Sequence, residues 1–504
     1  MRERWVERRV PPIESRTPGS ESSASESGST PVALRTRVIY GIGGMPTGII
    51  AASLNFFLLL YYNLVLEAPA PLVGLALAIA LGFDAISDPL VGYASDHLRS
   101  RWGRRHPFMY LATLPLGLFF YALWNPPLEL VGTDGLFLYL LATVIPVRLI
   151  LTFFEVPHQA LLPELTPDYD ERSTLSTYRF SMTLLGFTLL VFVAYRYFLR
   201  DTPEYANGLL DPTGYQAMGL VFAWALVVLI LLSAGGLHAL IPRLRAPEKS
   251  RAGSARALLR SVKATFSDRS LVAALGASFL IYVAYGYYGA LFGYTYGFFW
   301  ALSTEQISGM AFMMAVAAIA GLLVTPPLAR RLEKRTLALL MLGYAPVVTI
   351  APVALRLLGW FPAPDSPWLY LTLLVHLGWD YFNYHVFGIM MLSMLADVID
   401  QRELGTGERS EGIIYASYTL MMKATSGAGI LMASLLLWLL AFPTGAEVAE
   451  VPVGTIRNYG IAYLVSIPFG MWLGALVLSR YRLSRSSHAA TLEALRARGK
   501  GPVE

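Results

Sequence analysis

Twelve apolar segments, each long enough to cross a lipid bilayer, constrain the fold of this chain more than any other feature. A transmembrane helix needs about 20 predominantly apolar residues. The 504-residue chain is 55% hydrophobic and only 14% charged, so its apolar surface is too large for a soluble protein. These features predict an all-α membrane protein with 12 transmembrane helices. The segments lie near residues 38–62, 72–95, 107–124, 135–162, 177–199, 215–241, 271–300, 307–329, 336–360, 368–396, 413–442 and 458–480.

The loops between these segments differ in charge. Three loops, NLVLEAPAP, NPPLELVGTDG and FPAPDSP, contain no lysine or arginine, whereas the loops on the other side are strongly basic. Basic loops stay in the cytoplasm. We therefore expect both termini in the cytoplasm of a bacterial cell, with the chain crossing the inner membrane several times. The basic side carries Arg99, Arg101, Arg104, Arg105, eight basic residues between Arg243 and Arg269, and then Arg330, Arg331, Lys334 and Arg335.

A long basic segment divides the chain into two halves of six helices each. The second apolar segment ends in Pro89-Leu90 before a basic loop, and the eighth ends in Pro327-Leu328 before another. This weak repeat predicts two pseudo-symmetric six-helix halves with a site between them. The expected organisation is a disordered cytoplasmic tail at 1–37, an N-terminal half at 38–241, a basic cytoplasmic linker at 242–270, a C-terminal half at 271–480 and a cytoplasmic tail at 481–504.

Two aspartates lie within the second apolar segment. Asp84 and Asp88 are spaced i and i+4, so they share one helix face, and Ser87 adds a hydroxyl beside them. An aspartate at the bilayer centre costs about 2.5–3.5 kcal/mol on insertion scales, so two on one helix need a reason. A binding site for Na⁺ or H⁺ is one reason. Salt bridges to basic partners within the bundle are the alternative.

The fourth segment carries a polar stripe. Arg148, Thr152, Glu155 and Gln159 recur at i, i+4, i+7 and i+11, which places them along one side of a helix. Such a stripe cannot face lipid, because unsatisfied polar groups there cost several kcal/mol. It must face a water-filled cavity or a partner helix, and an Arg148–Glu155 pair that only cross-links helices is the alternative.

Further charged side chains fall in other apolar segments. Lys423 lies among small residues of the eleventh segment, and Arg179 lies near the start of the fifth. Together with Arg148, these two residues give three cations, which matches the three carboxylates of Asp84, Asp88 and Glu155. Equal numbers suggest a cavity whose charge is balanced by pairing. Asp380 and His385 lie in the tenth segment, with His376 nearby, although a lone intramembrane histidine is more often a helix contact than a proton relay.

Several function classes lack support in the sequence. The chain contains no cysteine, and it has no GxxxxGK[ST], GxSxG or HExxH motif. We therefore expect no enzyme activity, no ATP-driven step and no cofactor apart from a coupling ion. The net charge of +5 comes from loops and tails, so it reflects membrane topology and not nucleic-acid binding.

Three stretches resemble a known family. FDAISDPLVGYASDHLRSRWGRRHPF is similar to the signature of the glycoside–pentoside–hexuronide:cation symporters, whose best-known member is melibiose permease. The resemblance continues through EVPHQALLPELTPDYDERSTLSTYR and LADVIDQRELGTGERSEGIIYASYTLMMK, in both halves and in the expected order. It implies the fold of the major facilitator superfamily.

The resemblance also implies roles for individual residues. Asp84, Ser87, Asp88 and Thr152 would form the cation site, with the two aspartates as metal ligands if the ion is Na⁺. The family often has asparagine where Ser87 stands, which weakens the case for Na⁺ over H⁺. The resemblance places Glu155, Arg179 and Lys423 on the substrate side. From their place on the polar stripe we expect Arg148 and Gln159 to bind substrate as well, although Arg148 has no counterpart in the sugar carrier.

Two departures from the family bear on the substrate. Melibiose permease places an aspartate of its first span against the sugar, whereas this chain has Pro46-Thr47-Gly48 there. Gln159 stands near the position of an aromatic substrate contact. Melibiose is therefore not the expected substrate.

The loop after the second segment resembles the inner-gate motif of the superfamily. Asp96 at the helix end could pair with Arg101, Arg104 and Arg105 and hold the cytoplasmic side closed. Plain positive-inside topology would explain the arginines but not Asp96.

We therefore expect a secondary transporter that couples import of a sugar or sugar-like solute to a Na⁺ or H⁺ gradient by alternating access. The expected partners are a small-molecule substrate and the lipid bilayer, and we expect a monomer. The alternatives are a carrier of lysolipids or other amphiphiles and a non-transporting membrane sensor.

Overall fold

A computed structural model describes residues 32–166, 168–243, 268–406 and 411–499. These residues form helices joined by short loops, and 12 of the helical segments are long and apolar enough to cross a membrane. The predicted fold class and number of spans are confirmed. Most of the predicted tail at 1–37 and of the basic linker at 242–270 lies outside the described residues.

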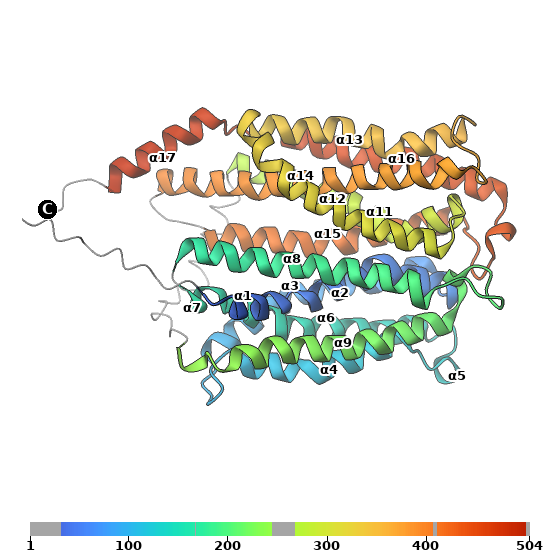
Figure 1. Ribbon diagram of the computed structural model, residues 1–504, viewed down its shortest axis with the longest axis horizontal. Coiled ribbons are helices and arrows are strands. Elements are labelled where there is room, and N and C mark those ends of the chain that lie inside the picture. Colours follow the sequence, from blue (N-terminus) through green and yellow to red (C-terminus); the bar gives the residue numbers. More distant parts are fainter. Residues whose placement is uncertain (1–31, 167, 244–267, 407–410, 500–504) are drawn as a thin grey trace, which may run out of the picture.

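The N-terminal half contains six spans. The first is an interrupted helix, and short helices lie between some of the others (Figure 1). The elements are α1 (Leu34–Ile42), α2 (Met45–Ala52), η1 (Ser53–Phe57), η2 (Leu60–Val65), α3 (Ala70–His97), α4 (His106–Trp124), α5 (Leu128–Val131), α6 (Leu136–Ala160), α7 (Leu162–Leu165), α8 (Tyr169–Val193), η3 (Ala194–Phe198), η4 (Gly208–Leu210), α9 (Pro212–His238) and η5 (Ile241–Arg243).

The C-terminal half contains the other six spans and ends in a shorter helix. Its elements are α11 (Arg269–Ala290), η6 (Tyr294–Phe299), α12 (Thr304–Arg331), α13 (Lys334–Leu357), α14 (Pro367–Thr406), α15 (Glu411–Leu439), η7 (Val448–Glu450), α16 (Val453–Leu478) and α17 (Arg485–Gly499).

Several helices extend beyond the apolar segments that predict them. α1 begins at Leu34, inside the range assigned to the tail, and Arg37 pairs with Glu171 of α8 at 2.9 Å. α8 begins well before residue 177, because Asp168 caps it by accepting a hydrogen bond from the Glu171 amide at 2.9 Å. α14 continues for ten residues beyond the predicted end at 396, most of them polar, to Thr406. Hydropathy marks only the part of a helix that lies in hydrocarbon, so polar helix ends escape it.

The two halves repeat the same packing. In the N-terminal half α2 packs on α8, α3 on α6, and α4 on both α6 and α9. In the C-terminal half the equivalent helices make the equivalent contacts: α11 packs on α15, α12 on α14, and α13 on both α14 and α16. The halves meet through α3 against α15 and α8 against α12, which are again equivalent pairs. This repeated pairing is the pseudo-symmetry that the sequence predicts.

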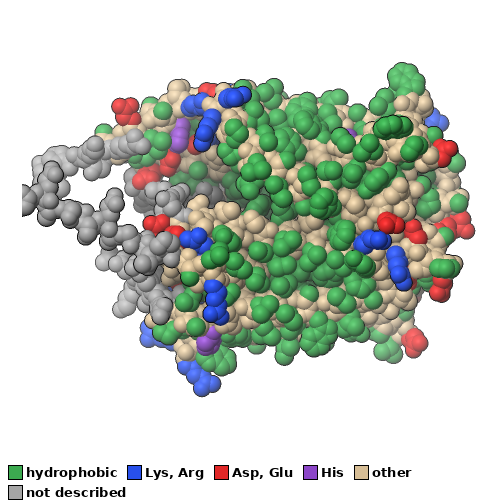
Figure 2. All heavy atoms as spheres, in the orientation of Figure 1, with side chains coloured by type: hydrophobic (Ala, Val, Ile, Leu, Met, Phe, Trp, Pro, Cys, Tyr) green, Lys and Arg blue, Asp and Glu red, His purple; other side chains and the backbone are tan. Residues whose placement is uncertain are grey.

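The two ends of the bundle differ. α1 begins at one end, where α17 also lies, and α5 lies at the other; we name them the terminal end and the α5 end (Figure 1). Hydrophobic side chains form a broad band between the ends, and charged side chains gather towards the ends (Figure 2). This is the surface expected of a protein that spans a bilayer.

Contacts between the halves concentrate at the α5 end. Tyr294 donates to the Asn63 side chain at 2.9 Å, the Gly445 amide donates to the Leu64 carbonyl at 2.9 Å, and Thr304 donates to Asp201 at 3.2 Å. Where both partners are described, every hydrogen bond or ion pair between the halves lies at this end or in the middle of the bundle.

Candidate functional site

The predicted polar residues meet in the middle of the bundle. α3 supplies Asp84, Ser87 and Asp88, and α6 supplies the stripe from Arg148 to Gln159. α8 adds Arg179, and α15 adds Lys423 from the other half. α3 packs against both α6 and α15, which brings these side chains together.

Asp84 pairs with Arg148. Both the Nε and the Nη2 of Arg148 donate to Asp84 Oδ2, the Nε at 2.8 Å. The Asp84 side chain is 3% exposed, and its second oxygen, Oδ1, has no hydrogen-bond partner among the described residues. Ser87 donates to the Asp84 backbone carbonyl at 3.4 Å, so its hydroxyl proton is directed at its own helix.

Asp88 is held between the two halves. Thr152 donates to its Oδ1 at 2.8 Å, and Lys423 donates to its Oδ2 at 2.7 Å. About a fifth of each charged side chain remains exposed, 22% for Asp88 and 18% for Lys423. This end of the site is therefore more open than Asp84.

Glu155 is the third carboxylate. Its Oε1 accepts from Gln159 at 3.0 Å and from Arg179 at 3.4 Å, and its Oε2 lies 3.8 Å from Lys423 Nζ. Lys423 thus lies between Asp88 and Glu155, nearer to Asp88. The structure brings together all the residues that the sequence assigns to the cation and substrate sites.

The charges of the site balance. Three carboxylates face three cations, and each carboxylate has at least one cationic partner. The Arg148–Glu155 cross-link that the sequence left open as an alternative is not among the ion pairs of the described residues, since Arg148 pairs with Asp84 instead. No group of three or more histidine or acidic side chains suited to a metal ion occurs in the part of the chain that the structure describes.

One hydrogen bond near this site, between Ser426 and Asn55, was not predicted from the sequence. Ser426, one turn after Lys423, donates to the Asn55 side chain at 2.6 Å, which joins η1 of the first span to α15. An asparagine inside an apolar run is a polar group that needs a partner. That signal could have found Asn55.

The residues of the predicted inner gate lie at the terminal end. Arg105 contacts Asp96 at 2.6 Å and Glu164 of α7 at 3.1 Å, and Arg104 contacts Glu164 at 2.6 Å. Arg101 lies over the Trp102 ring at 5.3 Å and has no acidic partner among the described residues. Glu164, which the prediction did not include, is the centre of this network.

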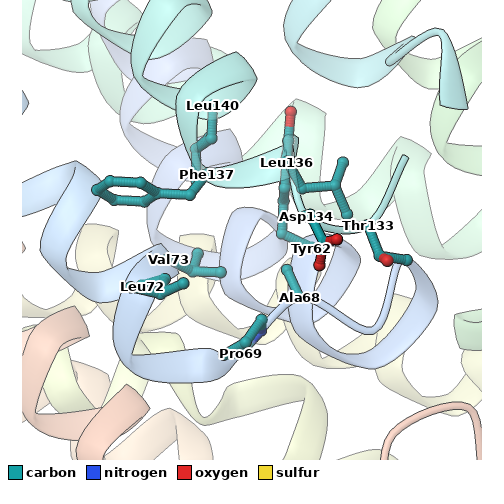
Figure 3. A pocket seen from close by; sticks show the side chains of 10 residues that line it. All are labelled: Tyr62, Ala68, Pro69, Leu72, Val73, Thr133, Asp134, Leu136, Phe137 and Leu140. Carbon is teal, nitrogen blue, oxygen red and sulfur yellow. The ribbon is translucent and has the colours of Figure 1, made fainter. Parts of the chain in front are cut away.

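A small pocket lies at the α5 end, between the start of α3 and the start of α6 (Figure 3). Its lining is mostly apolar, with Tyr62, Thr133 and Asp134 as polar exceptions. Leu72 and Val73 are about 17 Å along α3 from Asp84 at 1.5 Å per residue. The pocket is therefore separate from the charged site.

Comparison with known proteins agrees with this architecture. An uncharacterized symporter of Synechocystis, sll1374, is 27% identical over 92% of this chain and 96% of its own length. The isoprimeverose transporter of Lactiplantibacillus pentosus is 23% identical over 89% of this chain and 88% of its own. The crystal structure of a D-xylose-proton symporter superposes with a TM-score of 0.59 at 14% identity, covering 88% of this chain and 96% of that one.

The family model that describes MFS/sugar transport proteins matches residues 39–485, which is nearly the whole helical part of the chain. That family is one of transporters and not a class of enzymes. The chain belongs to the MFS/sugar transport protein family, and the predicted superfamily is confirmed.

Proposed function

We propose that this protein is a cation-coupled symporter that carries a sugar or glycoside across the membrane by alternating access. The observation that carries the proposal is Lys423. It belongs to the C-terminal half, and its ammonium group contacts Asp88 and Glu155, both of which belong to the N-terminal half. The ion site and the substrate side of the cavity thus share one cation.

The coupling follows from charge balance. A Na⁺ ion or a proton that binds at Asp88 removes the need for Lys423 there, and Lys423 moves towards Glu155, which lies 3.8 Å away. A ligand shifts a conformational equilibrium only through its differential affinity for the two states. Because Lys423 joins the halves, ion binding changes how strongly they are held together.

The oxygen atoms around the proposed ion site support binding of a cation there. Asp84 Oδ1 is a buried carboxylate oxygen without a hydrogen-bond partner among the described residues. Asp88 and the Thr152 hydroxyl lie one turn further along the two helices. A proton binds to one of these oxygens, whereas Na⁺ needs several as ligands. The choice of ion therefore depends on how many of these oxygens can contact the same ion.

The substrate side suits a polyhydroxylated solute. Gln159, Arg179 and Glu155 present amide, guanidinium and carboxylate groups next to Lys423. Sugar hydroxyls both donate and accept hydrogen bonds, so a mixed set of this kind can engage them. A lysolipid carrier is the competing function and would need an apolar path for an acyl chain.

The orientation completes the proposal. We propose that the terminal end faces the cytoplasm of a bacterial inner membrane, because the loops at that end carry the basic residues. The halves are then joined on the outer side, and the site is reached from the inside. A single chain contains both halves, so we expect a monomer.

The decisive experiment is uptake into proteoliposomes. Labelled pentosides, hexosides and a lysophosphatidylcholine are offered with a Na⁺ gradient, a pH gradient or neither. Asp88→Asn should abolish gradient-driven accumulation and keep partial substrate exchange, whereas Asp365→Asn, an exposed loop residue, should behave as wild type. Normal accumulation by Asp88→Asn, or uptake of the lysolipid alone, would refute the proposal.

A further inference from the structure

A buried acid of the C-terminal half lies away from the charged site. Asp380 of α14 is 3% exposed. Thr349 of α13 donates to its Oδ1 at 2.8 Å. Its other oxygen, Oδ2, has no hydrogen-bond donor among the described residues. The proposed symport mechanism does not use this acid.

His376 is the group that faces the unpaired oxygen. Its Nε2 lies 3.5 Å from Asp380 Oδ2 but only 3.0 Å from the Val348 carbonyl. A carbonyl can only accept, so Nε2 carries a proton and donates it to Val348. The other ring nitrogen, Nδ1, is buried without a partner. His385, the other histidine of α14, lies against the Tyr384 ring at 5.1 Å.

Among the described residues, no lysine or arginine pairs with Asp380. Where the chain is described, His376 is its sole ion-pair partner. Arg356 of α13 lies over the Phe299 ring at 4.5 Å, and the charged residues of α12 lie at the helix ends. Lys423 of α15 pairs with Asp88, and the α17 contact at Asp397 is about 25 Å along α14. The other titratable groups that interact electrostatically with Asp380 among the described residues are tyrosines: Tyr285 and Tyr288 of α11, Tyr296 of η6, Tyr344 of α13, Tyr381 of α14 and Tyr463 of α16.

We propose that Asp380 and His376 form a proton-binding site in the C-terminal half. A carboxylate oxygen without a donor in the membrane interior is costly, and binding of one proton from water removes the charge. The proton binds at Asp380 Oδ2, and the net charge of the pair changes from −1 to 0. The charged site in the middle of the bundle is already balanced by its own three cations, one of which is Lys423 of the C-terminal half, so the two sites differ in their need for a proton. This site does not depend on the identity of the transported solute.

The test measures the proton directly and needs no substrate. Purified protein in lipid nanodiscs is titrated from acidic to alkaline pH while infrared difference spectra record the C=O band of protonated carboxylic acids. Wild type should show such a band near neutral pH, and the band should disappear on alkalinisation. Asp380→Asn should lack it, whereas Asp397→Asn, which removes an acid of the same helix that is paired with Lys334, should keep it.

A second variant covers the case in which Asp380→Asn fails to fold. Thr349 stabilises the ionised form by donating to Oδ1, so Thr349→Val should make the band persist to higher pH. The proposal is overturned by a band that is unchanged in Asp380→Asn. A titration midpoint that Thr349→Val leaves in place overturns it equally. Loss of sugar transport without these changes would bear on the proposed symport and not on this site.

Discussion

Lys423 Nζ lies 2.7 Å from Asp88 Oδ2, although 335 positions separate the two residues along the chain. The contact joins α15 of the C-terminal half to α3 of the N-terminal half. It pairs Lys423, the one lysine that lies in the middle of the bundle among the described residues, with one of the two acids in the middle of α3. Every step of the proposed coupling begins from this ion pair.

Removing the charge of Lys423 alone should destabilise the protein more than removing the charges of both Lys423 and Asp88. Lys423→Met leaves Asp88 without its cation, and breaking a buried pair costs about 3–5 kcal/mol. With a fifth of each side chain exposed, we expect about 3 kcal/mol, the lower end of that range. The double variant Lys423→Met with Asp88→Asn should recover most of this loss, because neither charge remains.

Thermal unfolding in detergent measures both variants, and gradient-driven uptake provides the functional readout. The single and double variants should both lose coupled uptake. Coupled uptake by Lys423→Met would show that this lysine does not link the ion to the halves.

Arg148 provides a test that separates charge from geometry. Its Nε and Nη2 both engage Asp84, and a lysine would keep the charge but lose this fork. Arg148→Lys should therefore fold but bind substrate more weakly. Arg148→Ala should lose about 3–5 kcal/mol of stability, because Asp84 is almost fully buried. If Arg148→Lys transports normally while Arg148→Ala unfolds, the arginine has only a structural role.

In the network at the terminal end, two acidic residues contact the same arginine, so their contributions to stability can be compared. Glu164 is 7% exposed and contacts both Arg104 and Arg105, whereas Asp96 is 51% exposed and contacts Arg105. Glu164→Gln should cost about 1.5–3 kcal/mol, the range for hydrogen bonds to charged groups. Asp96→Asn should cost less than about 1 kcal/mol, since exposed pairs contribute little. Equal shifts in melting temperature would contradict this ranking.

The sequence predicts the spans, the two halves and the charged residues, because each is a local signal. An acid in an apolar run, a helical stripe and a basic loop are all visible within a few turns. The partners are not visible in this way. Arg148 could equally have paired with Glu155 of its own helix, and its contact with Asp84 depends on how α3 and α6 pack. Asn55 and Glu164 went unassigned because their roles come from contacts with distant helices.

Close helix packing within the C-terminal half gives a final prediction. Gly429 of α15 faces α11, where an added Cβ would lie 2.5 Å from the Tyr287 amide nitrogen and 2.7 Å from the Gly286 Cα. Backbone atoms of a packed helix cannot move aside as a side chain can, so the helices would have to separate. Gly343 of α13 is a matched control, since a Cβ there would meet no atom within 4 Å.

Gly429→Val should therefore destabilise the protein by about 1–3 kcal/mol or more, the cost of overpacking. Gly343→Ala should be neutral or stabilising by up to about 1 kcal/mol, because alanine favours a helix over glycine. Both variants are compared by thermal unfolding and by the monodispersity of the purified protein.

Because α15 also carries Lys423, separation of α15 from α11 should shift the ammonium group relative to Asp88. Gly429→Val should then lose coupled uptake even at temperatures at which it remains folded, whereas Gly343→Ala should transport as wild type. Normal coupled uptake by a folded Gly429→Val would show that the position of α15 against α11 does not set the Lys423–Asp88 contact.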